Sequence, residues 1–101
     1  MTVTVFVTVA VHAGCELEFE AAVKSVLIPT RSQAGFVKSG FYRDIAVRGT
    51  FVLYEVWDSE ADLQRHLQSA GMSSYLQACE TLVRHKAVYL TQNAEQLATA
   101  A

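Results

Sequence analysis

The sequence predicts an α+β fold in which strands and helices follow one another in the order β-α-β-β-α-β. Residues 3–11 alternate valine with other residues, which is the two-residue period of a strand. After Gly14, apolar side chains repeat at helical spacing from Phe19 to Thr30. Residues 51–67, FVLYEVWDSEADLQRHL, read as a strand that runs directly into a helix. This order predicts the ferredoxin-like arrangement, a four-stranded antiparallel sheet with its helices on one face.

The first strand and the first helix each have one clear apolar side. The strand places five valines on one face and Phe6, flanked by threonines, on the other. Gly14 precedes the helix. Pro29 should kink or end the helix because proline cannot donate to the preceding turn, and Gly35 is the predicted stop. The apolar stripe of the helix is Phe19, Ala22, Val23, Val26, Leu27 and Thr30.

A hairpin is predicted next. Its first strand runs from about Phe36 to Val47, with Gly40 marking either a bulge or a close approach of backbone. Arg48-Gly49 is the predicted turn, and Thr50 to Trp57 is the return strand.

The next helix is predicted to begin after Ser59, a good N-cap, with Asp62 in the capping-box position. Gly71 should break it, and a second short helix should start at about Ser73. Val83 to Thr91 reads as the fourth strand. Leu63, His66, Leu67 and Ala70 form the stripe of the first of these helices, and Tyr75, Leu76, Cys79 and Leu82 are the predicted buried set of the second.

Composition limits the possible roles of the chain. It has 101 residues, 51% of them hydrophobic, and no internal repeat or linker, so we predict a single domain over 1–101. The tail, about 93–101, is either a frayed helix or an arm across a partner. A formal charge of −2 with scattered basic residues argues against nucleic acid, and no apolar run is long enough to cross a membrane. Cys15 and Cys79 match no metal spacing and are expected to be reduced thiols, so the default location is cytoplasmic.

The face of the sheet that the helices leave open is too apolar for water. Phe6 lies on that face of the first strand, and the second strand adds Phe41 or Tyr42, depending on register. A second copy of the sheet is the simplest cover, so we predict a homodimer with sheet-on-sheet packing.

Candidate chemistry gathers where the third strand meets its helix. Glu55 and Trp57 share the strand face of Phe51 and Leu53, and His66 lies on the apolar stripe of the helix. If the two faces meet, His66 is either a general base, because imidazole titrates near neutrality, or a core histidine bonded to Glu55 or to backbone. Trp57 is either a large core residue or the wall of a pocket. Arg31 either caps helix carbonyls or binds an anionic substrate group.

The chain resembles the antibiotic biosynthesis monooxygenase (ABM) family of dimeric α+β-barrel proteins over nearly its whole length. The resemblance rests on Thr30-Arg31 followed by Gly35, on the segment FVLYEVWDSEADLQRHLQS, and on the helix with Tyr75-Leu76. It implies a dimeric α+β barrel with a pocket inside each subunit, and a reaction without metal or flavin. It also implies that Trp57 and His66 sit at pocket-lining positions, and these two are the expected catalytic residues. The predicted substrate-binding residues are Tyr75, Glu55, Arg31 and Met72.

The chain also departs from the family pattern. The usual Glu-Pro-Gly before the second strand is Gln33-Ala34-Gly35 here, a common tyrosine is replaced by Ser39, and a frequent second histidine aligns with Gly71. The heme-degrading branch has an asparagine on the first strand, which is absent here, and its iron-binding histidine aligns with Leu76. Heme breakdown is therefore disfavoured.

Three functions remain open from the sequence. The first is a cofactor-independent monooxygenase for a phenol, quinol or anthrone, for which the protein must supply a base, a dry pocket and orientation. The second is an isomerase or cyclase on the same scaffold, because a base in a pocket also serves enolisation. The third is a non-catalytic dimeric ligand-binding module, which the replacements at Ser39 and Gly71 favour.

Overall fold

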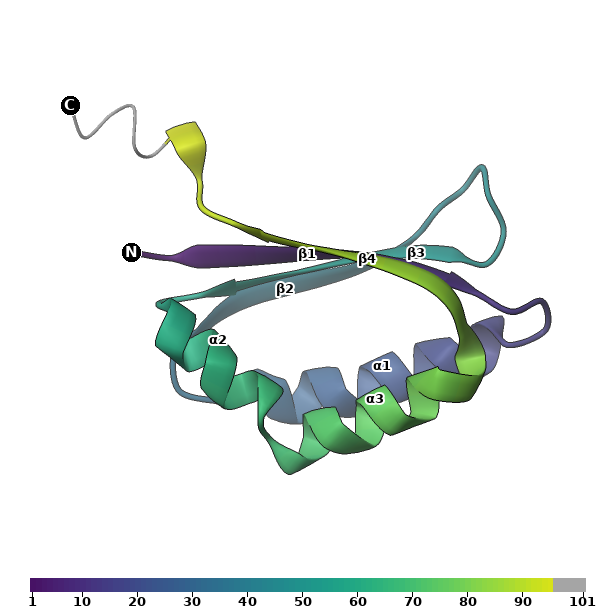
Figure 1. The fold of residues 1–101 in the computed structure, drawn as a ribbon, viewed down its shortest axis with the longest axis horizontal. Coiled ribbons are helices and arrows are strands. Elements are labelled where there is room, and N and C mark those ends of the chain that lie inside the picture. The colour runs from purple at the N-terminus through teal and green to yellow at the C-terminus, as the bar shows by residue number, and fades with distance from the viewer. Residues whose placement is uncertain (96–101) are drawn as a thin grey trace.

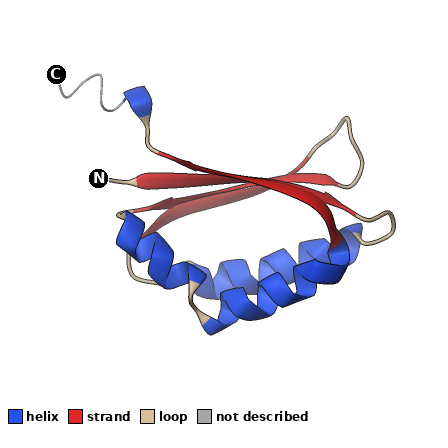
Figure 2. Cartoon of the chain, in the orientation of Figure 1, coloured by secondary structure: helices blue, strands red, loops and turns tan. Residues whose placement is uncertain are grey.

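The computed structural model describes residues 1–95 and has its strands and helices in the predicted order (Figures 1 and 2). The elements are β1 (Val3–Val11), α1 (Glu16–Thr30), β2 (Phe36–Arg43), β3 (Thr50–Trp57), α2 (Glu60–Leu67), α3 (Ala70–Leu82) and β4 (Val83–Thr91).

The four strands form one sheet in the order β2-β3-β1-β4, and every neighbouring pair is antiparallel. All three helices lie on the same side of this sheet (Figure 1). The ferredoxin-like α+β fold predicted from the sequence is confirmed. The register places Val3 opposite Trp57 and Val9 opposite Phe51, so the valine face of β1 and the aromatic face of β3 both turn toward the helices.

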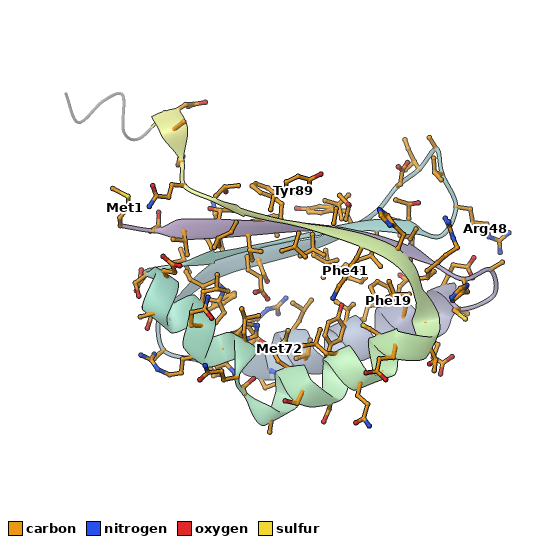
Figure 3. The ribbon with its side chains drawn as sticks, viewed as in Figure 1. Met1, Phe19, Phe41, Arg48, Met72 and Tyr89 are labelled. Atoms are coloured by element: carbon orange, nitrogen blue, oxygen red, sulfur yellow. The ribbon has the colours of Figure 1, made fainter. Side chains whose placement is uncertain are left out.

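The core consists of two clusters at opposite ends of the sheet. At one end Phe19 of α1 packs against Phe51 and Phe41, with ring centroids 5.1 and 6.1 Å from its own (Figure 3). At the other end Trp57 packs with Val3 and Leu63. Between the two clusters β1 contributes only the short side chains of Val5 and Val7, which leave unfilled space beneath the helices.

The predicted hairpin is wrong in its details. β2 ends at Arg43 instead of Val47, because Asp44 starts the turn: its Oδ1 accepts hydrogen bonds from the backbone N–H groups of Ala46 and Val47. The Arg48-Gly49 pair is therefore the end of a six-residue loop, 44–49, instead of a tight turn. The register shift in β2 lies between Phe36 and Lys38, so Gly40 is not the bulge.

Two helix boundaries also differ from prediction. α1 ends at Thr30, one residue after Pro29, so the proline ends the helix and Gly35 lies in the following loop. The break between α2 and α3 falls at 68–69 instead of Gly71, because the hydroxyl of Ser69 accepts from the backbone N–H of Met72 and caps α3. Of the predicted buried set, Cys79 and Leu82 are buried, Tyr75 is half-buried and Leu76 is 40% exposed.

The sheet face away from the helices carries a continuous row of aromatic rings. Tyr89, Phe6 and Tyr54 stand in register across β4, β1 and β3, and Tyr42 stacks on Tyr54 with ring centroids 6.4 Å apart. We call these four residues the aromatic row; Figure 3 shows Tyr89 on this face. Gly40 is the next position of that register, where a Cβ would collide with the Tyr54 ring.

No helix within residues 1–95 is long and apolar enough to cross a membrane. The C-terminal tail predicted at about 93–101 lies outside the described residues from position 96 onward.

Candidate functional site

An apolar cavity of about 340 Å³ lies between the sheet and the helices. Its floor comes from β1, β3 and β4, and its roof from α1, α2 and α3. The unfilled space beside Val5 and Val7 belongs to this cavity. Several of the lining residues on β4, α2 and α3 are about half exposed, which places the mouth between β4 and these two helices; they are Leu67, Leu76, Val88 and Leu90.

A cluster of three polar side chains meets the cavity at Glu55. Glu55 of β3 lines the cavity, and its Oε1 accepts a hydrogen bond of 3.2 Å from the indole Nε1–H of Trp57. The same Oε1 lies 3.5 Å from Nε2 of His66 on α2. The rings of Trp57 and His66 stack with centroids 4.7 Å apart, and both are buried, at 0% and 3% exposure. The meeting of imidazole and indole predicted from the sequence is present.

The cap of α2 and the loop before β2 hold this cluster in place. Ser59 caps α2 by accepting from the backbone N–H of Asp62, as predicted, and its hydroxyl donates to the Asp62 carboxylate at 2.7 Å. Gly35 has a φ of +83°, and a Cβ at Gly35 would collide with the Asp62 side chain. Only glycine therefore lets this loop dock against the first turn of α2.

That docking brings Gln33 to the buried histidine. Gln33 Oε1 lies 2.7 Å from His66 Nδ1. An amide oxygen can only accept, so Nδ1 carries the hydrogen and Nε2 of the neutral ring has the lone pair. Sequence reasoning missed Gln33 as a site residue. The available signal was its place two residues before a glycine where the family pattern has Glu-Pro-Gly.

The protonation of His66 is governed by two opposing effects. Burial lowers the pKa of His66, because the charged imidazolium loses its water, and the Glu55 carboxylate acts in the opposite direction. Nε2 itself is buried without a hydrogen-bond partner among residues 1–95.

A second polar group of the cavity lies on α3. Burial raises the pKa of Tyr75 well above its ordinary value, and the hydrogen bond to Cys79 and the charge of Glu55 add to this. Burial also raises the pKa of the Cys79 thiol, against the opposing effects of Tyr75 and Lys86. The raised pKa values keep the Tyr75 hydroxyl and the Cys79 thiol protonated at neutral pH.

The predicted site residues divide into three groups in space. Glu55, Tyr75 and Met72 line the cavity; Figure 3 shows Met72 on the helical side. His66 and Trp57 lie behind Glu55 and are not lining residues. Arg31 is exposed at the end of α1, where its backbone N–H donates to Leu27, and its side chain is not part of the cavity wall.

Within residues 1–95, no three His, Cys, Asp or Glu side chains lie close enough together to hold a metal ion. Cys15 and Cys79 are both free.

Comparison with known proteins places this chain in one family. The model of the antibiotic biosynthesis monooxygenase family, ABM, matches residues 2–78, and the chain belongs to that family. A curated relative, the uncharacterized protein sll1783 of Synechocystis, is 29% identical over 66 residues, which cover 65% of this chain and 45% of the relative. The chain thus spans less than half the length of that relative.

Solved structures share the fold at low sequence identity. SnoaB, a cofactor-independent oxygenase from Streptomyces nogalater, was crystallised as a point mutant that is 24% identical to this chain, with a TM-score of 0.84. The match covers 92% of this chain and 93% of SnoaB. PA3566 from Pseudomonas aeruginosa is 20% identical with a TM-score of 0.85, over 91% of this chain and 93% of the other.

Proposed function

We propose that this protein is a cofactor-independent monooxygenase that oxidises a small aromatic substrate of the phenol, quinol or anthrone type with molecular oxygen. One observation carries the proposal: a largely apolar cavity is lined by a carboxylate that lies 3.5 Å from a buried imidazole. A volume of about 340 Å³ is at the small end of the range for ligand sites, which suits a small flat molecule. Membership of the monooxygenase family supports the same reading.

The reaction balances without an external reductant. An anthrone-type CH₂ group loses a proton to the polar cluster, and its carbanion combines with O₂ by electron transfer and radical recombination to form a peroxide anion. In the peroxide the C–H electron pair then forms the second C–O bond, the O–O electron pair leaves with the terminal oxygen, and the proton from carbon passes to that oxygen, which gives C=O and hydroxide. The hydroxide recovers the proton from the cluster and leaves as water, so that R₂CH₂ and O₂ become R₂C=O and H₂O.

The protein makes three contributions to these reaction steps. The cluster of His66, Glu55 and Trp57 holds and returns one proton. The apolar walls exclude water, which would quench the anion. Tyr75 remains a neutral hydrogen-bonding group that can orient a substrate oxygen.

Trp57 contributes to the proposed reaction through Glu55. Its ring is stacked on His66 on one side, Phe36 packs edge-on at 5.5 Å, and it is fully buried. The indole N–H of Trp57 donates a hydrogen bond to Oε1 of the Glu55 carboxylate, so Trp57 fixes the position of this oxygen.

The active form is proposed to be a homodimer built through the aromatic row. Phe6, Tyr42 and Tyr89 are 41%, 58% and 56% exposed in the single chain, which is costly for three rings on one continuous face. A second copy of the same face covers them, with a small aromatic molecule and oxygen as the other partners of the protein.

Oxygen uptake by the metal-stripped protein tests the function, with hydroquinones, anthrones and flavonols as substrates and autoxidation subtracted. We expect protein-dependent uptake with at least one substrate, unaffected by chelator and reduced about 10²–10⁴-fold in His66→Ala. Thr81→Ala, an exposed substitution on α3, is the control. Turnover under strict anaerobiosis would identify an isomerase instead. Stabilisation by these compounds with no turnover would identify a binding module.

A further inference from the structure

We infer, on the basis of the proposed function, that Glu55 is the catalytic residue that takes the substrate's proton and that it passes this proton to Nε2 of His66. The cavity reaches Glu55 but not His66, which is 3% exposed behind it. A substrate in the cavity therefore contacts the carboxylate first. His66 is the second acceptor, and Gln33 is the residue that positions it.

The hydrogen bonds of the cluster leave one position for a proton. Gln33 Oε1 fixes the hydrogen of the neutral imidazole on Nδ1, so the lone pair of Nε2 faces Oε1 of Glu55 at 3.5 Å. Nε2 of His66 and Oε1 of Glu55 are both acceptors, and no hydrogen bond joins them. Nε2 is fully buried, and a single proton between the two atoms would give it a hydrogen bond. Apo structures commonly show such catalytic contacts longer than they are in the working complex.

The charges favour a transfer that stays inside the cavity. Before the transfer, the Glu55–His66 pair carries one negative charge and the substrate none. Afterwards, the pair is neutral overall and the substrate is the anion. The net charge of the site is therefore −1 before and after the transfer, so the transfer adds no further buried net charge, which would be costly.

Each step is a simple proton transfer. The substrate's O–H or C–H bond breaks, its electron pair stays on the substrate, and an O–H bond forms on Glu55. That O–H bond then breaks as the N–H bond forms on Nε2 of His66. The reverse transfers deliver the proton to the hydroxide that leaves as water.

Few other ionisable groups face this pair. Tyr75 of α3 interacts with Glu55 and is held protonated, and Lys86 of β4 lines the same cavity. Asp62 on the first turn of α2 and Arg65 on its last turn are paired with each other at 2.9 Å. From the loop before β2, the group that reaches His66 is the uncharged amide of Gln33.

Histidine NMR on the ligand-free protein tests the pair without any substrate. We expect neutral His66 to carry its hydrogen on Nδ1 and to titrate at Nε2, and Glu55→Gln to move this titration to lower pH. The matched control is Glu60→Gln, which changes an exposed glutamate on α2, the helix that carries His66. This variant should leave the titration of His66 unchanged. A hydrogen on Nε2 of the neutral ring, or a titration that Glu55→Gln does not move, overturns the relay.

Gln33 is tested by its effect on the tautomer. Gln33→Leu removes the acceptor for Nδ1–H, so the two neutral tautomers of His66 should become mixed. Gln33→Glu keeps an acceptor at the same place and should restore the Nδ1–H form. A purely structural role would not predict this rescue, and an unchanged tautomer in Gln33→Leu overturns the assignment.

Kinetics with an accepted substrate test the order of transfer. Glu55→Gln and His66→Gln should each lower kcat/KM by about 10²–10⁴-fold. The double variant should have a kcat/KM no lower than that of the less active single variant, because the effects of residues that act as one unit are not additive. An active Glu55→Gln beside an inactive His66→Gln would show that His66 takes the proton directly and overturn the proposal. If no compound is oxidised, the oxygenase function fails, and the NMR result alone decides whether Glu55 and His66 share a proton.

Discussion

At the scale of single residues, the burial of His66 links this site to the stability of the whole chain. The pKa of His66 is lowered by burial, with only partial opposition from Glu55. In the unfolded chain a histidine titrates near pH 6.5. Between the lower folded pKa and that value, the unfolded state binds a proton that the folded state does not, so stability falls as the pH falls.

We therefore predict that the free energy of unfolding decreases as the pH is lowered from 7 through 6.5 toward 5, and that His66→Gln shows a flatter dependence. One differential proton sets an upper limit of about 1.4 kcal/mol per pH unit on the difference in slope. Urea unfolding of both proteins at several pH values measures it. His12 and His85 are present in both proteins, so their contributions to the difference in slope cancel. Identical slopes would show that His66 is not held neutral by burial.

The residues of the site could be predicted only as far as local patterns reach. The strand period of two places Glu55 and Trp57 on one face, and the helix period places His66 opposite them, so this meeting followed from the sequence. Gln33 is thirty-three positions away from His66, and its contact depends on how a loop docks. No local period encodes that docking. The order of Glu55 before His66 depends on packing depth, which is equally invisible in a pattern.

At the scale of elements, the loop before β2 is held by a glycine whose role can be measured against a second one. Gly35 and Gly14 both have positive φ, +83° and +88°. A Cβ at Gly14 would meet nothing within 4 Å, whereas at Gly35 it would collide with the Asp62 side chain. The backbone strain of an alanine would thus be similar at the two positions, and only at position 35 would its Cβ also collide with a neighbouring side chain.

We expect Gly14→Ala to cost about 1–2 kcal/mol of stability for its left-handed backbone and Gly35→Ala to cost about 1–3 kcal/mol more. The difference measures the docking of the loop on α2, on which the contact of Gln33 with His66 depends. Urea denaturation of both variants and the parent gives the two values. Equal losses would mean that the loop moves away from Asp62 without cost.

Element boundaries show which signals compete when a sequence is read. The sequence pattern predicts the helix break at Gly71, but the Ser69 hydroxyl caps α3 two residues earlier by accepting from the backbone N–H of Met72. Asp44 likewise ends β2 by bonding two backbone N–H groups, although apolar residues continue to Val47. The alternation of β1 and the stripe of α1 had no such competitor. β1 was predicted correctly, and so was α1 apart from its end, which lies at Thr30 and not at Gly35.

At the scale of the whole molecule, the two faces of one strand perform separate tasks. The valines of β1 are short enough to leave a cavity toward the helices, while Phe6 on its other side belongs to the aromatic row. The same sheet thus separates a proposed reaction site from a proposed dimer interface.

The dimer is tested by placing a charge in the aromatic row. Tyr89→Glu adds an unpaired carboxylate that a sheet-on-sheet interface would bury, and a two-fold interface buries it twice. We expect the parent protein to sediment as a dimer and Tyr89→Glu to dissociate at least about a hundredfold more readily. Leu17→Glu, at an 80% exposed position of α1, is the matched control and should remain dimeric. Circular dichroism checks that both variants fold.

A parent that sediments as a monomer at every concentration, or a Tyr89→Glu variant that associates as tightly as the parent, would move the interface away from this face. The aromatic row would then need another partner to account for its exposure.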